Sequence, residues 1–297
     1  MTRESTNCTT ATNYALEGEI KNEPSVPAIP GSLGENGPWL EIIPNRPSDI
    51  PKTILTKTHC KGFCSGRSCG PDKTIHTVRS FMMGCLSGTR AVATSKGLKK
   101  IDVTYRPSLV KKAIHIFRHP LDNIVARFHL EYNVQKMKGN KKYVELFPKN
   151  ETGFRRWCAA DDQNRGLLSS RLVDERLRHK LYKIPCFNEF FRYTQWHNLA
   201  FSTTRDMNLP TMILHYHEYS ADFKLARSKV LNWLGFSSEK PKNDIEFVSG
   251  KIYRHYYSTE ERRLIRAFVK EFASAETWEQ LQEYDFQTEE ELVSSSR

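Results

Sequence analysis

Three short apolar runs constrain the fold of this chain more than any other feature. They span residues 53–57, 113–117 and 211–216 and are rich in β-branched side chains. This composition and length are typical of buried β-strands. Segments with helical spacing separate the runs, and strands that alternate with helices predict a parallel sheet. We therefore expect an α/β fold in three layers, with one parallel sheet flanked by helices.

The helices that should cover this sheet have recognisable ends. Pro120 fits the first turn of a helix after the second strand. Gly235 is placed to end a helix, and Ser258 with Glu261 forms a capping box at the start of another. The large aromatic residues of 187–202 follow helical spacing and are expected in the core. The predicted helices are 75–86, one from Pro120, 187–202, 221–234, one from Ser258, and 274–284.

One domain is expected, with a tail at each end. Residues 1–37 lack sustained periodicity and predict a disordered polar tail, and residues 287–297 form an acidic, Ser-rich tail. The domain between them, 38–286, shows no internal repeat. Within it, residues 87–100 are polar and basic and predict a connector. Residues 136–180 are also basic and predict a loop-like insertion or an acceptor-binding region.

The charge of the chain indicates which partners it attracts. Forty-five Lys and Arg against thirty-four Asp and Glu give a formal net charge of +11. Such a surface attracts phosphates, sulfated sugars, nucleic acid or acidic membranes, although solubility alone can explain a single basic patch. No apolar run reaches the length of a transmembrane helix. The first residues also lack the apolar core of a signal peptide, so no export signal is expected in this chain.

The seven cysteines conflict with the missing export signal. The six apart from Cys8 could form three disulfides, which persist in oxidising compartments. Asn7-Cys8-Thr9 and Asn150-Glu151-Thr152 are also acceptor sequences for N-linked glycans. A natural start missing from this chain would resolve the conflict. The six cysteines are Cys60, Cys64, Cys69, Cys85, Cys158 and Cys186.

A zinc site is an alternative use of the first three of these cysteines. Cys60, Cys64 and Cys69 could form a zinc knuckle with His59, and the positive charge would then suggest a nucleic-acid-binding module. However, the spacing C-x3-C-x4-C matches no common structural zinc site. We therefore favour disulfides that brace this loop and expect no metal.

Polar side chains follow the predicted strands where each of them ends. Lys57-Thr58-His59 ends the first strand, Arg118 follows the second and Tyr216 ends the third. Open α/β sheets bind ligands at the carboxyl ends of their strands. Arg118 also lies beside the predicted helix N-terminus at Pro120, where free N–H groups favour an anion. The sequence thus predicts an anion site at this edge.

In order and spacing these blocks resemble the sulfotransferases that use 3′-phosphoadenosine 5′-phosphosulfate. The blocks are Lys57-Thr58-His59, Arg118-His119-Pro120-Leu121-Asp122 and Tyr216-His217-Glu218, the last similar to the family's Tyr-Glu-Asp. The cysteine loop and the segments IFRHPLDNIVARFHLEY, GFRRWC, EFFRYTQWHNLAF and KIYRHYYSTEER are similar to predicted proteins of diatoms and other algae. The resemblance covers about residues 51–285. It implies a P-loop NTPase-like sulfotransferase fold and a place in the Golgi lumen.

The resemblance also implies catalytic roles. His59 would act as the general base that takes the proton of the acceptor hydroxyl, for which its pKa is suited. Lys57 would stabilise charge on the transferring sulfuryl group and the leaving phosphate oxygen. Such a transfer depends on positioning and charge stabilisation, so cationic side chains can replace a metal. The acceptor would be a hydroxyl, with carbohydrate suggested by the basic 136–180 region.

Further residues would hold the donor 3′-phosphoadenosine 5′-phosphosulfate. Arg118 would bind its 3′-phosphate, and Tyr216 would approach its adenine end. Lys251 and Arg254 would belong to a basic closing segment near the same phosphate. Glu218 is interpreted as a cap of the helix that follows it.

Two departures from the family fall on donor binding. No Gly-containing loop that could wrap the 5′-phosphosulfate precedes Lys57, and Ala126 replaces the serine that usually contacts the 3′-phosphate. The chain would then be a truncated product or a relative that no longer turns over. One alternative is a non-catalytic protein that binds anions or glycans. Another is a basic nucleic-acid-binding module, which the helical core pattern of the aromatics disfavours.

Overall fold

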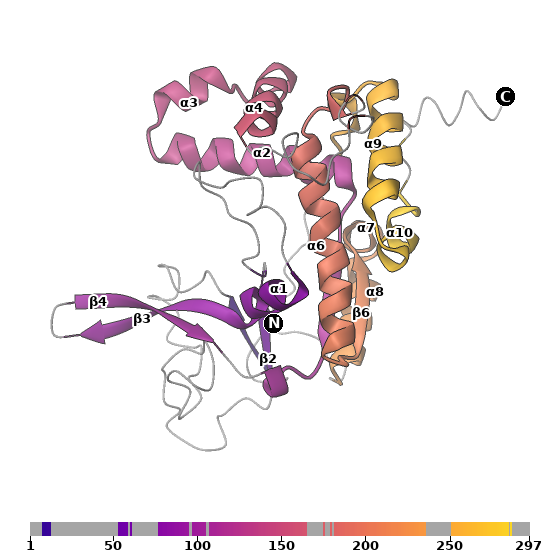
Figure 1. Ribbon diagram of the computed structural model, residues 1–297. Helices are drawn as coiled ribbons and strands as arrows, with labels where there is room; N and C mark the ends of the chain where they lie inside the picture. The colour runs from indigo at the N-terminus through magenta and orange to yellow at the C-terminus, as the bar shows by residue number, and fades with distance from the viewer. Residues whose placement is uncertain are drawn as a thin grey trace.

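The computed structural model describes residues 8–12, 53–58, 60, 77–94, 97–104, 107–164, 175, 179, 181–235, 251–284 and 286. These residues form a mixed α/β structure that is mostly helical (Figure 1). Strands β1 (Cys8–Thr12) and β2 (Thr53–Lys57) pair in parallel, as do β5 (Ala113–Phe117) and β6 (Thr211–His215). Strands β3 (Ser87–Thr94) and β4 (Gly97–Thr104) form an antiparallel pair. The helices are α1 (Val78–Leu86), α2 (Pro120–Met137), α3 (Lys141–Leu146), α4 (Glu151–Asn164), α6 (Phe187–Asp206), α7 (Tyr216–Ala221), α8 (Phe223–Leu234), α9 (Thr259–Phe272) and α10 (Ala275–Leu281), with short 3-10 turns η5 (Pro107–Leu109) and η7 (Arg254–Tyr256).

Helix α6 is the centre of this arrangement, and Figure 1 shows other elements along its length. It contacts α1, α2, α4, α9 and α10. Phe187, Phe190 and Phe191 of α6 are buried in the main hydrophobic core. Full burial of one such side chain contributes about 1.5–3 kcal/mol. The prediction that Phe190, Phe191, Trp196 and Phe201 belong to the core is confirmed for Phe190 and Phe191, whereas Phe201 and Trp196 are partly buried and pack against the hydrophobic clusters.

Some of the polar groups that α6 buries have partners, whereas Gln195 Oε1, His197 Nδ1 and Thr203 Oγ1 have none among the described residues. Glu189 is 2% exposed, and its carboxylate pairs with Arg192 at 2.7 Å and with Arg127 of α2 at 2.9 Å. A buried carboxylate needs such partners, because an unpaired charge loses its hydration without compensation. The hydroxyl of Thr194 donates to the Phe190 carbonyl at 2.9 Å, within the helix. The helix can therefore be buried on several sides.

The parallel pair β5–β6 packs one face against α6. The Phe117 ring stacks on that of His197 with centroids 3.9 Å apart, and the His115 ring meets Phe201 at 5.1 Å. Because successive strand residues point to opposite faces, Ile116 points away from α6, and it is 52% exposed. Helix α6 therefore covers one face of β5, whereas the other face is open at Ile116.

The single parallel sheet expected from the sequence is not formed within the described ranges. Strand β2 pairs with β1, while β5 and β6 form a pair of their own. The region 1–37, predicted as a disordered tail, contributes the strand β1. Pairing choices of this kind depend on contacts between distant segments, which the composition of one strand does not specify.

Two further segments differ from the sequence interpretation. The described residues of 87–100, predicted as a connector, belong to the antiparallel β3–β4 pair. Its second strand has the alternation of Ile101 and Val103 with polar neighbours, a strand signal that the lysines obscure. The region 136–180, predicted as loop-like, contains helices α3 and α4.

Two of the predicted helix ends, at Gly235 and Ser258, agree with the structure. Gly235 ends α8 with φ of 83°, a left-handed conformation that suits a residue without Cβ. The Ser258 hydroxyl accepts from the Glu261 backbone N–H, while Glu261 accepts from the Ser258 N–H. The predicted capping box is therefore confirmed, because it depends only on residues three positions apart.

Two disulfides connect these elements. Cys60 bonds to Cys85 on α1, and Cys158 on α4 bonds to Cys186 at the start of α6. Disulfides are compatible with a secretory or extracellular protein. Cys64 and Cys69 lie outside the described residues, but the bond to Cys85 occupies the Cys60 sulfur that a zinc knuckle would require. Among the described helices, none is long and apolar enough to cross a membrane.

The buried histidines predict that stability falls with acidification. Burial lowers the pKa of His115 to about 4 and, with help from His115 and His215, that of His197 to about 3. The unfolded chain takes up protons on both below about pH 6.5 whereas the folded chain does not, so acid favours unfolding. Replacing His197 by Phe keeps a ring against Phe117 and removes one titrating group.

The measurement is the free energy of unfolding from urea titrations between pH 4 and 8. Between pH 6.5 and 4 we expect the difference between His197→Phe and the natural chain to grow by up to about 1.4 kcal/mol per pH unit in favour of the variant. Above pH 7 the difference should be constant, which is the internal control. Comparing the two chains also cancels opposing contributions from buried carboxyls such as Asp162. A constant difference across the whole range would contradict the prediction.

Candidate functional site

The carboxyl ends of β5 and β6 bring Arg118 and Tyr216 together. The guanidinium carbon of Arg118 lies 5.1 Å from the centroid of the Tyr216 ring. The parallel register, in which Phe117 is opposite His215, explains this contact, since each side chain belongs to the residue that follows its pair. A guanidinium over an aromatic face is attracted by the ring and keeps its N–H groups for other partners.

Arg118 differs from several other arginines in its lack of a carboxylate partner. In the described part of the chain, no Asp or Glu lies within ion-pair distance of it. Surface and core arginines elsewhere do have such partners, so they serve the structure. The paired arginines are Arg127, Arg155, Arg192, Arg205 and Arg263.

The backbone around Arg118 is held from two sides. The Tyr193 hydroxyl of α6 donates to the Arg118 carbonyl at 2.7 Å. The next residue, His119, is the N-cap of α2, and its Nδ1 accepts from the Leu121 N–H at 3.2 Å. The backbone that carries the Arg118 side chain is therefore fixed beside the N-terminus of α2, a helix of 18 residues.

Beyond Tyr216, a wall of aromatic and imidazole rings completes this region. His215 Nδ1 lies 2.9 Å from the Tyr284 hydroxyl, and the Tyr284 ring also meets those of His119 and His217. Burial, followed by nearby carboxylates, raises the pKa of Tyr284, so its hydroxyl stays protonated. Glu218 accepts from the His215 N–H at 2.9 Å and so caps α7, the helix that contains it, rather than the helix after it as the sequence predicted. Its other carboxylate oxygen pairs with Lys229 of α8 at 2.6 Å.

The segment with Lys251 and Arg254 is fixed along α2. The Asp122 carboxylate, in the first turn of α2, accepts from the Tyr253 N–H at 2.6 Å. Two turns further along the same helix, Nδ1 of His129 lies 3.2 Å from the Tyr253 hydroxyl and Nε2 lies 3.2 Å from the Tyr256 hydroxyl. These contacts bring the basic segment 251–254 beside the helix that begins next to Arg118.

The charge along this segment is positive. The pKa of His129 is lowered to about 4, first by burial and then by Lys149 and Lys251. Lys149 and Lys251 therefore lie near enough to His129 to disfavour a further positive charge on its ring. Lys251 is exposed, so it can reach a ligand in solvent.

The structure describes less of the region around Lys57 and His59. Lys57 is the last residue of β2, and His59 lies outside the described residues. Their neighbour Cys60 is buried against Phe81 of α1 and against Leu199 and Ala200 of α6. The structure therefore does not show Lys57 or His59 next to Arg118.

Helix α6 nevertheless relates the two halves of the predicted site. Cys60 belongs to the same buried cluster as Ala200 of α6, and Tyr193 of α6 donates to the Arg118 carbonyl. At 1.5 Å per residue these two positions are about 10 Å apart along the helix axis. The anchor points of the predicted catalytic loop and of the anion site are thus two turns apart on one helix.

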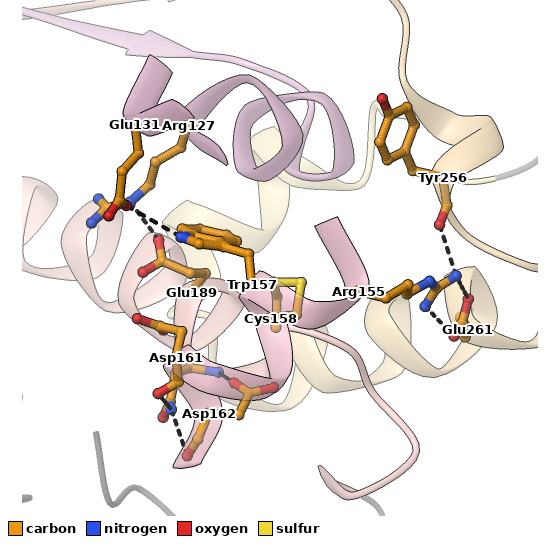
Figure 2. The surroundings of a disulfide bond; sticks show 12 residues. Arg127, Glu131, Arg155, Trp157, Cys158, Asp161, Asp162, Glu189, Tyr256 and Glu261 are labelled. Atoms are coloured by element: carbon orange, nitrogen blue, oxygen red, sulfur yellow. Dashed lines mark hydrogen bonds and ion pairs between the residues drawn. A yellow bond between two sulfur atoms is a disulfide. The ribbon is translucent and has the colours of Figure 1, made fainter. Parts of the chain in front are cut away.

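The surroundings of the Cys158–Cys186 bond form a second polar cluster, which Figure 2 shows. Asp162 accepts from the Asn188 N–H at 3.1 Å, and Trp157 donates to Glu131 at 3.2 Å. Burial, with Asp161 and Glu189 nearby, raises the pKa of Asp162 to about 8 despite backbone hydrogen bonds that lower it.

These polar groups connect α4 to the start of α6 and to α2. The same helix is connected to α9 through Arg155, which pairs with Glu261 and donates to the Tyr256 carbonyl at 2.7 Å (Figure 2). Each polar partner in this cluster belongs to another structural element. We interpret the cluster as support of the fold rather than as a catalytic centre.

Sequence reasoning missed the residues that position the site. Tyr193, Asp122 and Tyr253 make contacts across 75 to 131 positions of the chain. No spacing rule predicts hydrogen bonds over such separations. His119, the N-cap of α2, also positions the site, and it does have a local signal because it directly precedes Pro120.

Comparisons with protein-family models, curated proteins and solved structures find no match for this chain. The function is therefore argued from the residues and their geometry.

The Asp122 contact predicts a measurable stability loss. In Asp122→Ala the Tyr253 N–H loses its acceptor in a partly buried place, which should cost about 1–3 kcal/mol. Asp122→Asn keeps an acceptor oxygen and should cost less. Glu279→Ala, at an exposed helical carboxylate, is the matched control. Urea unfolding monitored by circular dichroism gives the free energies, and equal stabilities for Asp122→Ala and the control would refute the proposed role.

Proposed function

We propose that this protein is a sulfotransferase-like enzyme that moves a sulfuryl group from 3′-phosphoadenosine 5′-phosphosulfate to a hydroxyl acceptor. The observation that carries the proposal is the Arg118 guanidinium, stacked on Tyr216 and without a carboxylate partner in the described structure. It lies where two parallel strands end and α2 begins. Such a place suits the phosphate of a nucleotide.

Each described residue of the predicted donor site has a physical role. Arg118 would form charge-assisted hydrogen bonds with the 3′-phosphate, because its planar N–H groups match phosphate oxygens. Tyr216 would support the adenine end, next to the same guanidinium. Lys251 and Arg254 would close over the phosphate from the segment held by Asp122.

The chemistry would take place at Lys57 and His59. His59 would accept the proton of the acceptor hydroxyl while its oxygen forms a bond to sulfur. The bond between sulfur and the 5′-phosphate oxygen breaks, and 3′-phosphoadenosine 5′-phosphate leaves. Lys57 would stabilise the charge on the sulfuryl oxygens and on the leaving oxygen.

The finer features of the resemblance are part of the same proposal. A three-layer, P-loop NTPase-like sheet would unite β2 with β5 and β6. The disulfides are compatible with a secretory protein, and the resemblance specifies the Golgi lumen. The acceptor class would be carbohydrate.

A second candidate function is that of a non-catalytic protein that binds anions or glycans. It is favoured by Ala126, which stands on α2 where the family has a phosphate-binding serine. Such a protein would keep the Arg118 site and bind the nucleotide product without turnover. A nucleic-acid-binding role has less support, because the α6 aromatics Phe187, Phe190 and Phe191 are buried instead of available for stacking.

Calorimetric titration with 3′-phosphoadenosine 5′-phosphate tests the donor site. We expect saturable binding that Arg118→Ala weakens about tenfold to a hundredfold, the effect of losing charge-assisted hydrogen bonds. Arg263→Ala, at an exposed arginine paired with Glu260, is the matched control and should bind like the natural chain. Absent or millimolar binding that Arg118→Ala leaves unchanged would end the proposal.

Transfer of radiolabelled sulfate from the donor to a panel of carbohydrate acceptors separates the two candidates. The enzyme predicts transfer that His59→Ala and Lys57→Ala abolish, while both variants still bind the nucleotide product. Binding without transfer for the natural chain would favour the non-catalytic protein.

A further inference from the structure

We propose that Asn150 carries an N-linked glycan, attached in the oxidising compartment where the disulfides form. Asn150, Glu151 and Thr152 form an acceptor sequence, and all three residues are exposed. An acceptor sequence alone arises by chance. The argument therefore depends on the geometry of the turn that presents it, and it is independent of the function proposed above.

Asn150 lies in a tight turn that directly precedes α4. The Asn150 N–H donates to the Pro148 carbonyl at 2.7 Å, and the Phe154 N–H donates to the Asn150 carbonyl at 2.9 Å. Gly153 is required in this turn, because a Cβ there would lie 1.7 Å from the Pro148 oxygen. The backbone under the acceptor side chain is thus closely packed.

The two ends of the Asn150 side-chain amide have different surroundings. Its Oδ1 accepts from the Gly153 N–H at 2.9 Å and caps α4. Among the described residues its Nδ2 has no hydrogen-bond partner. The nitrogen that would carry a sugar is therefore the end of the amide that the fold does not use.

The modification is chemically compatible with this cap. Asn150 Nδ2 would form a bond to the anomeric carbon of an oligosaccharide donor of the lipid-pyrophosphate class. The nitrogen loses a proton, and the lipid pyrophosphate leaves with the bonding electrons. The product keeps the Oδ1 acceptor, so the glycan projects into solvent without removing the hydrogen bond to Gly153.

The rest of α4 is rigid enough to hold the turn in place. Phe154 and Trp157 are buried in the core, and Cys158 is bonded to Cys186. That disulfide also supplies the second, independent observation, since such bonds persist in the compartments of the secretory pathway. The glycan and the disulfide would therefore be formed along one route.

The test expresses the full chain behind a cleavable signal sequence in a eukaryotic secretory host. The luminal and secreted fractions are treated with peptide N-glycosidase and analysed by glycopeptide mass spectrometry. We expect a glycan at Asn150 in the natural chain. It should be lost completely in Asn150→Asp, which keeps an oxygen for the cap, and in Thr152→Ala, which leaves Asn150 in place.

Thr152→Ser keeps the acceptor sequence, so this variant should carry the glycan that Thr152→Ala lacks. Asn7→Gln removes the other acceptor sequence, whose asparagine lies outside the described residues. This variant should leave the Asn150 glycan unchanged. Luminal protein that contains the Cys158–Cys186 disulfide but an unmodified Asn150 would overturn the proposal. Because Thr152 takes no part in the α4 cap, its two variants remain decisive if Asn150→Asp folds poorly.

Discussion

The burial of helix α6 is the interaction on which the rest of the described structure depends. Its aromatic residues enter the core on one side, and the Phe117–His197 stack fixes the β5–β6 pair on another. The pairs that Glu189 makes with Arg192 and Arg127 lower the cost of burying this helix on several sides. Without those partners, the cost of desolvating the carboxylate would offset much of what aromatic burial contributes.

The same helix organises the region proposed to bind the donor. Tyr193 fixes the backbone of Arg118, and Ala200, two turns further along α6, belongs to the buried cluster that contains Cys60. Helix α2 then positions the basic segment through Asp122 and Tyr253. Arg118 is left with an aromatic face as its neighbour, a contact that holds the cation without neutralising it. Among the described residues Arg118 has no carboxylate partner, whereas the paired arginines stabilise the structure.

Some elements could be predicted from the sequence because their signals are local. The strand at 113–117 is confirmed, and β6 ends one residue before the predicted strand does. The capping box of α9 and the glycine at the end of α8 are confirmed as well, since each involves residues a few positions apart. In contrast, the β3–β4 pair and the helices α3 and α4 were missed. Paired lysines interrupt the pattern of β4 and α3, whereas α4 contains no lysine and lies in a region interpreted only by its basic charge.

For the candidate site, the sequence by itself determined the residue types: a cation and an aromatic residue, each following a buried strand. Only the tertiary structure decided that Arg118 meets Tyr216, that Tyr193 holds it and that segment 251–254 lies along α2. It also decided that β2 pairs with β1 rather than with β5. Local order follows from steric and capping preferences within a few residues, whereas these contacts depend on which distant surfaces can be buried together.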